Sequence, residues 1–176
     1  FVDDSGLPPA SFKLVLNEVE QVLPNKADVT QTVTLAEGRN TIVLRATDTA
    51  GNEAAPVSRT VELDTTGPET APENLQAGVS ISGADIVLTW KADVNAATYN
   101  VYRDTQTAIT DISILTPVAV NVSGARWTDI DVDPSITYYY ALTSVDVAGN
   151  KGTKVSNSPN VTLIPSAKGG AAIISD

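Results

Sequence analysis

The sequence predicts an all-β chain built from two tandem β-sandwiches joined by a proline-rich linker. Short runs rich in Val, Ile, Thr and Tyr alternate with polar residues, and Gly, Pro, Asn or Asp interrupts them every few positions. Almost no stretch shows a helical period. The length of 176 residues suits one large domain or two of about 100 residues each.

Twelve strands are expected, and each alternates apolar and polar residues as a strand with one buried face does. Those before the linker are Phe12–Asn17, Val19–Leu23, Asp28–Leu35, Thr41–Thr47 and Val57–Leu63. Those after it are Leu75–Val79, Asp85–Trp90, Thr98–Arg103, Pro117–Val122, Ala125–Thr128, Thr137–Val145 and Val155–Leu163.

The linker is expected within Asp64–Asn74, where DTTGPETAPEN contains two prolines and no alternation. Proline fixes φ and cannot donate a hydrogen bond to a sheet, so such a run makes a stiff connection. We therefore assign residues 1–67 to the first sandwich, 68–72 to the linker and 73–165 to the second sandwich. Residues 166–176 are expected to form a flexible tail or a donor strand.

A pentapeptide occurs twice, as DTAGN from Asp48 and as DVAGN from Asp146, 98 positions later. Each copy lies between two expected strands, where the glycine can take the positive φ of a hairpin loop and the aspartate can close an Asx turn. We therefore interpret Asp48, Gly51, Asn52, Asp146, Gly149 and Asn150 as turn residues. The alternative is that each aspartate and asparagine are ligands of Ca²⁺, which would need further ligands that the local sequence does not supply.

The same offset aligns the strands that precede the two copies. Ile42, Leu44 and Ala46 fall on Tyr140, Leu142 and Ser144, and all six are expected to point inward.

Composition excludes several functional classes. A net charge of −10 disfavours nucleic acid and anionic membranes as partners, and no apolar run approaches the roughly 20 residues of a membrane span. The chain has no Cys and no His, so thiolate and Ser-His-Asp chemistry and most zinc sites are excluded within it. We expect no enzymatic activity and no cofactor, and only oxygen ligands for Ca²⁺ remain.

The second half resembles a fibronectin type III domain from about Glu73 to Ile164. The resemblance rests on PENLQA, DIVLTW, ATYNVYR, ARWTDID and DVDPSITYYYALTSVDVAGN, in that order. It implies a tyrosine corner at Tyr138, whose hydroxyl would bond to nearby backbone. It also implies a core containing Trp90, Tyr99, Val101, Tyr140 and Leu142.

The first half resembles the bacterial Ig-like repeats of large surface and secreted proteins. The similar stretches are LAEGRNTIVLRATDTAGNEA and VELDTTGP. Such repeats have two further strands before SFKLVLN, whereas this sequence opens abruptly on FVDDSG, so we expect a processed or excised piece. The first sandwich is therefore expected to be incomplete.

An incomplete sandwich leaves a strand edge open for another chain. We expect a separate polypeptide or a neighbouring copy to complete it by strand addition. The candidate donor strand is the run Ala171, Ala172, Ile173, Ile174 and Ser175; alternatively this run begins the next domain.

Acidic residues flank the linker, and in some adhesins of this kind such carboxylates bind Ca²⁺. The candidate ligands are Asp3, Asp4, Asp48, Asp64 and Glu69. Carboxylates are also common in solvated turns, which is the alternative.

The leading hypothesis is a non-enzymatic structural or adhesive module of a bacterial cell-surface or extracellular protein, assembled into filaments by strand complementation. The alternative is an accessory spacer or carbohydrate-binding region of a secreted hydrolase. A carbohydrate surface would use exposed aromatic residues, for which the candidates are Tyr102, Trp127 and Tyr139. These residues could instead belong to the core.

Overall fold

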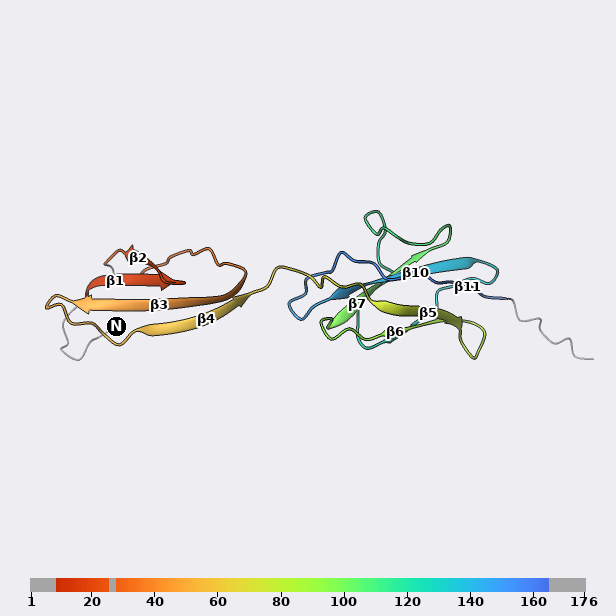
Figure 1. Ribbon diagram of the computed structural model, residues 1–176, viewed down its shortest axis with the longest axis horizontal. Helices are drawn as coiled ribbons and strands as arrows, with labels where there is room; N and C mark the ends of the chain where they lie inside the picture. The colour runs from red at the N-terminus through yellow and green to blue at the C-terminus, as the bar shows by residue number, and fades with distance from the viewer. Residues whose placement is uncertain (1–8, 26–27, 165–176) are drawn as a thin grey trace, which may run out of the picture. The chain divides into compact units, whose positions relative to one another are not determined.

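The computed structural model describes residues 9–25 and 28–164, and within them every regular element is a β-strand. The chain divides into two compact units, Phe1–Thr65 and Thr66–Asp176 (Figure 1). The prediction of an all-β chain is confirmed.

The described part of the first unit holds one antiparallel sheet of four strands in the order β2-β1-β3-β4. The strands are β1 (Pro9–Leu16), β2 (Val19–Leu23), β3 (Gly38–Asp48) and β4 (Val57–Leu63). Leu14 of β1 lies opposite Leu44 of β3, which in turn lies opposite Val57 of β4. This register determines which side chains share a face of the sheet.

One face of this sheet is mostly apolar, and we call it the apolar face. It carries Phe12, Leu14, Leu16, Val19, Leu23, Ile42, Leu44, Ala46, Val57 and Val61. The other face is mostly polar and includes the ion pair between Lys13 Nζ and Glu20 Oε1 at 2.8 Å. Such patterning is typical of a sheet that packs a second layer on one side.

Two expectations for the first unit are wrong. Residues 28–35 do not form a strand, and within the described residues they pair with no other strand. Of the three β3 residues expected to point into a core, Ala46 is buried and Ile42 is half-buried, but Leu44 is 39% exposed. Leu44 is on the apolar face, and no second sheet of described residues covers it.

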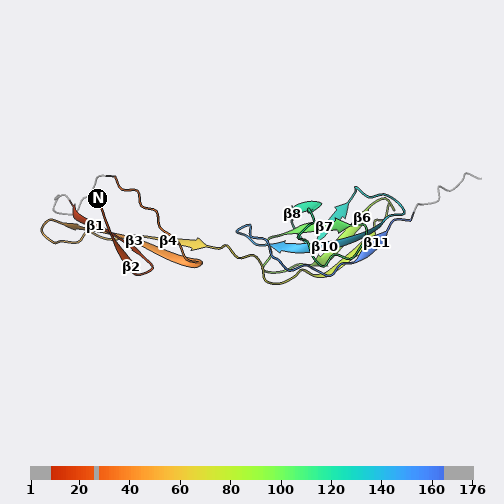
Figure 2. The same ribbon diagram turned by 90° about the horizontal axis from the view of Figure 1, so that it is seen from above.

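The second unit is a sandwich of two sheets (Figure 2). One sheet has the order β11-β10-β7-β8 and the other β5-β6-β9. The strands are β5 (Glu73–Val79), β6 (Ile86–Lys91), β7 (Thr98–Asp104), β8 (Ala119–Val122), β9 (Arg126–Asp129), β10 (Thr137–Val145) and β11 (Asn160–Thr162).

The last strand is shorter than the expected Val155–Leu163. Ser156 donates its N–H to the carbonyl of Leu142, but Leu142 donates its own N–H to the Ser156 hydroxyl. A side chain therefore replaces a backbone acceptor, and the regular ladder is interrupted. Next to it, the Asn157 side chain bonds to both the N–H and the C=O of Leu75 in β5, at 3.0 and 2.8 Å.

The core of the second unit lies between its two sheets. The structure places all five of the core residues named from the sequence there, beside Leu75, Ile86, Leu88, Tyr138 and Leu163. Trp90 and Tyr99 meet edge to face, with ring centroids 5.2 Å apart. Such an arrangement adds about 0.5–1.5 kcal/mol to the burial of the two rings.

The outer face of β7 and β10 is buried as well. Tyr102, Ala141 and Ile109 form a second cluster, against which Ile112 and Leu115 pack. The long connection between β7 and β8 therefore folds over this face. As a result, β10 is buried without interruption from Tyr140 to Val145.

The segment expected to be a linker, residues 68–72, lies within the second unit. Pro72 is fully buried, and a side chain at Gly152 would collide with the carbonyl oxygen of Pro68. The proline-rich segment is thus packed against the unit that follows it.

Candidate functional site

The two pentapeptides have the same geometry. Asp48 accepts hydrogen bonds on Oδ1 from the N–H groups of Ala50 and Asn52, both at 2.8 Å, and Asn52 Nδ2 donates to Oδ2. Gly51 has a φ of 92°, a conformation that side chains with a Cβ rarely adopt. The carboxylate is therefore occupied in closing its own turn.

The second copy repeats these contacts. Asp146 accepts from the N–H of Asn150 at 2.8 Å and from its Nδ2 at 3.1 Å, and Gly149 has a φ of 91°. Burial raises the pKa of Asp146, but the hydrogen bonds from Asn150, Ala148 and Gly149 outweigh this effect and the pKa is lowered. Both copies have the arrangement of a hairpin turn.

The predicted calcium ligands are not assembled within the described residues. Asp3 and Asp4 lie outside those residues, and Asp64 and Glu69 belong to different units. Across residues 9–25 and 28–164, no group of three or more acidic side chains is arranged to hold a metal ion. Calcium binding stays a prediction.

Within residues 9–25 and 28–164, no helix is long and apolar enough to cross a membrane.

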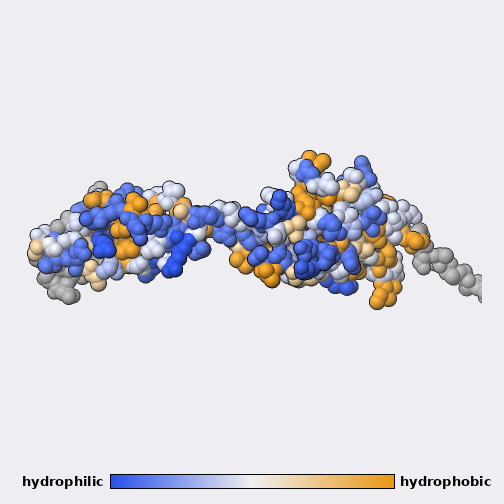
Figure 3. Space-filling view, viewed as in Figure 1, coloured by the Kyte–Doolittle hydropathy of each residue, from blue (hydrophilic) through white to orange (hydrophobic). Residues whose placement is uncertain are grey.

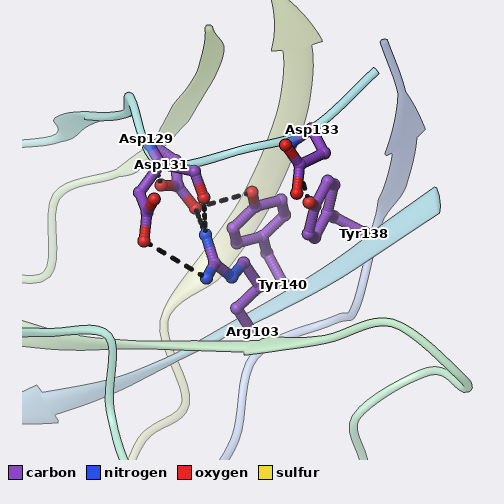
Figure 4. A network of polar contacts seen from close by, with 6 residues as sticks. All are labelled: Arg103, Asp129, Asp131, Asp133, Tyr138 and Tyr140. Atoms are coloured by element: carbon purple, nitrogen blue, oxygen red, sulfur yellow. Dashed lines mark hydrogen bonds and ion pairs between the residues drawn. The ribbon is translucent and has the colours of Figure 1, made fainter. Parts of the chain in front are cut away.

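A buried polar network joins the two sheets of the second unit (Figure 4). Asp129, at the end of β9, is only 3% exposed, and its Oδ2 accepts hydrogen bonds from Arg103 Nη1 and from the Tyr140 hydroxyl, both at 2.8 Å. Arg103 Nη1 also donates to the backbone carbonyl of Asp131 at 2.6 Å. Every member has a charged or hydrogen-bonded partner, as burial of such groups requires.

The network raises the pKa of both Tyr140 and Arg103. Burial raises the pKa of Tyr140. The hydrogen bond to Asp129 and the negative charge of Asp129 raise this pKa further, so the Tyr140 hydroxyl stays protonated far above the usual range. Burial lowers the pKa of Arg103, but the bond and charge of Asp129 outweigh it and the pKa is raised. A site for proton transfer needs a pKa near the working pH. The network therefore suits a structural clamp between sheets.

The tyrosine corner and an asparagine in the first unit occupy equivalent positions. The Tyr138 hydroxyl accepts from the N–H of Asp133 at 2.9 Å, beside the clamp in Figure 4. Asn40, which lies 98 positions earlier, is fully buried and bonds to both the N–H and the C=O of Ala36, at 2.9 and 2.7 Å. Asn40 therefore anchors the start of β3, as Tyr138 does for β10.

Sequence reasoning missed Asn40, Arg103 and Asp129. The offset between the pentapeptides pairs Asn40 with Tyr138, so this residue could have been found by the same alignment. No comparable signal exists for Arg103 and Asp129, because their contact depends on which sheet each strand joins.

The three aromatic residues proposed for a carbohydrate-binding surface do not lie together on one exposed face. Tyr102 is fully buried in the cluster beneath the β7–β8 connection, and Tyr139 packs against that cluster. Trp127 lies in β9 opposite Leu88 and packs against the core between the sheets. The side chains thus belong to different faces.

A groove of about 390 Å³ lies on the apolar face of the first unit. One wall consists of Leu14, Leu16, Val19 and Gln21, and the other is formed by residues 31–34 and Ala36. Val19 is 71% exposed. Exposed hydrophobic side chains are visible on the surface of each unit (Figure 3), and here they lie beside a groove on an open sheet face.

A smaller depression of about 200 Å³ lies in the second unit around β5 and β6. The Thr70 hydroxyl donates to Asp93 Oδ2 at 2.8 Å, and Lys91 pairs with Glu73 at 2.7 Å. These polar groups bond to one another.

The candidate donor run Ala171–Ser175 lies outside the described residues.

Comparison with known proteins supports the fold. No protein-family model matches the chain. The chain is 32% identical over 83 residues to an amylopullulanase of Thermoanaerobacter thermohydrosulfuricus, which covers 47% of this chain and 5% of that protein. The match therefore spans a small fraction of the relative's length.

Two solved structures are similar over most of the chain. Domains A168–A170 of titin match 89% of this chain and 55% of theirs, with 18% identity and a TM-score of 0.55. The FN1–FN3 domains of chicken CNTN1 match 90% and 57%, with 11% identity and a TM-score of 0.51. The expected Ig-like or fibronectin type III fold class is confirmed.

Proposed function

We propose that this chain is a non-catalytic accessory region of a larger secreted carbohydrate-active hydrolase, in which it acts as a spacer. The observation that carries the proposal is the 32% identity over 83 residues to an amylopullulanase. The sequence alone favoured a cell-surface or filament role, and this similarity supports the hydrolase alternative better.

The spacer role is supported by the second unit's architecture. Its polar network is a fully bonded clamp, and its aromatic side chains are divided between two faces. A carbohydrate-binding surface would instead align aromatic rings on one exposed face. The acidic composition is compatible with an extracellular location, which we also propose.

Two experiments test the proposal. The first is to read the intact gene, where we expect a glycoside hydrolase catalytic domain in the same polypeptide. Repeated Ig-like units without such a domain would favour the surface role instead.

The second experiment uses the 176-residue chain itself. We expect no release of reducing sugar from starch or pullulan, and no retardation in native gels that contain either polysaccharide. Turnover that is lost on replacement of one carboxylate would overturn the non-catalytic assignment, and retardation would replace the spacer with a carbohydrate-binding role.

A further inference from the structure

Two glycines of the second unit lie where two segments of its backbone touch. One is Gly152, which follows the pentapeptide turn, and the other is Gly67, at the start of the proline-rich segment 67–72, which we call the connector. A Cβ added to Gly152 would lie 2.6 Å from the carbonyl oxygen of Pro68, and one added to Gly67 would collide with the backbone of Lys151 and Gly152. Only residues without a side chain therefore fit this contact.

Backbone conformation does not explain either glycine. Gly51 and Gly149 have the positive φ that their turns require, whereas Gly67 and Gly152 do not have a positive φ. A residue with a side chain could adopt the same backbone conformation at both positions. The close approach of the connector therefore remains as the reason for glycine.

The first unit shows that the hairpin itself does not need a glycine at this position. Ala54 lies 98 positions before Gly152, and its N–H donates to the carbonyl of Ala46 at 2.9 Å. The N–H of Gly152 donates in the same way to the carbonyl of Ser144 at 2.8 Å. The two positions make equivalent bonds after the same pentapeptide turn, yet one of them is alanine. Glycine occurs at the one against which the connector packs.

The rest of the connector is attached to the second unit as well. Pro68 and Pro72 are both buried. Between them, the Thr70 hydroxyl donates to Asp93 Oδ2 at 2.8 Å. Proline also restricts φ at two positions of the connector, so fewer conformations compete with the packed one.

The backbone that receives the connector is itself held in place. Lys151 forms a β-bridge with Val145, and its Nζ lies 5.4 Å from the centre of the buried Tyr102 ring. Gly152 is bonded to Ser144 of β10. The connector therefore packs against two anchored residues.

We propose that the contact between residues 67–68 and 151–152 is a lock that makes the connector a fixed part of the second unit. In the proposed spacer, the connector then adds a constant length and does not act as a flexible tether. This use of the lock rests on the proposed function, but the lock itself is tested on the 176-residue chain. A chain without the lock could still be a spacer, and a locked chain need not belong to a hydrolase.

Cleavage by a glutamate-specific protease tests the lock. Glu69 is exposed, but a protease cuts the connector only when the connector leaves its packed conformation. We expect Gly152→Ala and Gly67→Ala each to speed cleavage after Glu69 by about tenfold. If the two prolines alone stiffened the connector, neither change would matter. Cleavage after Glu53 in the first unit is the internal reference.

Gly78→Ala is the matched control. Gly78 also lacks a positive φ, but a side chain added there meets nothing. The control therefore carries the same effect of alanine on the unfolded chain without a collision. Its cleavage after Glu69 should be as slow as in the parent chain.

A distance measurement tests the parent chain directly. The chain has no cysteine, so spin labels attached to Glu69→Cys and Thr89→Cys report only the distance between the connector and β6. Both positions are exposed. We expect a narrow distance distribution, which Gly152→Ala should broaden by about twofold as the connector becomes a flexible chain.

Three results would overturn the proposal. The parent chain and Gly152→Ala could be cut after Glu69 at the same rate. Gly78→Ala could speed this cleavage as much as Gly152→Ala does. The labelled parent chain could also show a broad distance distribution, and this result would decide the question even if Gly152→Ala failed to fold.

Discussion

The Tyr140 hydroxyl donates a hydrogen bond of 2.8 Å to Asp129 Oδ2, and this bond connects β10 in one sheet of the second unit to β9 in the other. The same oxygen accepts from Arg103 on β7 at 2.8 Å. Three strands thus meet at one buried carboxylate. Stability at this end of the sandwich should depend on all three side chains.

Tyr140→Phe should lower the free energy of unfolding of the second unit by about 1.5–3 kcal/mol, the usual value of a hydrogen bond to a charged group. Urea denaturation followed by Trp fluorescence measures the change. Tyr139→Phe is the matched control, because the Tyr139 hydroxyl makes no hydrogen bond with another described residue. Equal losses for the two variants would contradict a specific role for the Tyr140 hydroxyl.

Alkaline pH should destabilise the second unit through the same residue. The raised pKa of Tyr140 means that the unfolded chain loses this proton near pH 10 while the folded chain keeps it. Because the folded state then binds more protons, its stability is intact below about pH 10 and falls above it, by at most about 1.4 kcal/mol per pH unit. Denaturation at several pH values should show this slope, and Tyr140→Phe should reduce it. An unchanged slope would exclude Tyr140 as its source.

Arg103→Met should destabilise the second unit by about 3–5 kcal/mol, since it leaves a buried carboxylate without its cation. The control is Lys91→Met, which breaks the ion pair with Glu73 at the surface and should change stability far less. Thermal unfolding of both variants measures the difference. A similar small shift for both would mean that Asp129 is adequately paired by Tyr140 alone.

Gly149→Val should cost about 1–3 kcal/mol, because a β-branched residue is strained at a φ of 91°. The position is otherwise open, so the loss measures backbone strain and not a collision. Gly78→Val is the control, since Gly78 is in an exposed part of β5, where an added side chain also meets nothing. Chemical denaturation compares the two.

Asp146→Asn should be milder than Gly149→Val, because asparagine can still accept the turn's hydrogen bonds. Thermal scans with and without Ca²⁺ complete the test. A larger effect of Asp146→Asn, or a strong rise of the melting temperature with Ca²⁺, would show that the turns bind metal.

Several strand bounds were predictable from short runs of β-branched and aromatic residues bounded by turn residues. Val19–Leu23, Val57–Leu63 and Thr137–Val145 have the bounds expected from alternation. Residues 28–35 alternate equally well, but within the described residues they pair with no other strand. An alternating sequence shows which side chains of a segment could face a core. It does not show whether the backbone of that segment forms hydrogen bonds with another strand.

The clamp could not be predicted because it is formed by tertiary structure. The hydrogen bond from Arg103 to Asp129 joins residues 26 positions apart and depends on β7 and β9 belonging to opposite sheets. The burial of Tyr102 likewise depends on the fold of the β7–β8 connection. That connection contains isolated hydrophobic residues, Ile109, Ile112 and Leu115, and no periodic pattern.

The contact between Asn157 and Leu75 has a consequence for synthesis on the ribosome. The Asp146 turn joins residues four positions apart, whereas the Asn157 side chain bonds to a strand 82 positions earlier. Loop-closure entropy rises with this separation, so the turn should form early and the bond to Leu75 late. The nascent second unit should therefore remain open at β5 until Asn157 has left the exit tunnel, and during that time Leu75, Ile86 and Leu88 are candidates for chaperone binding.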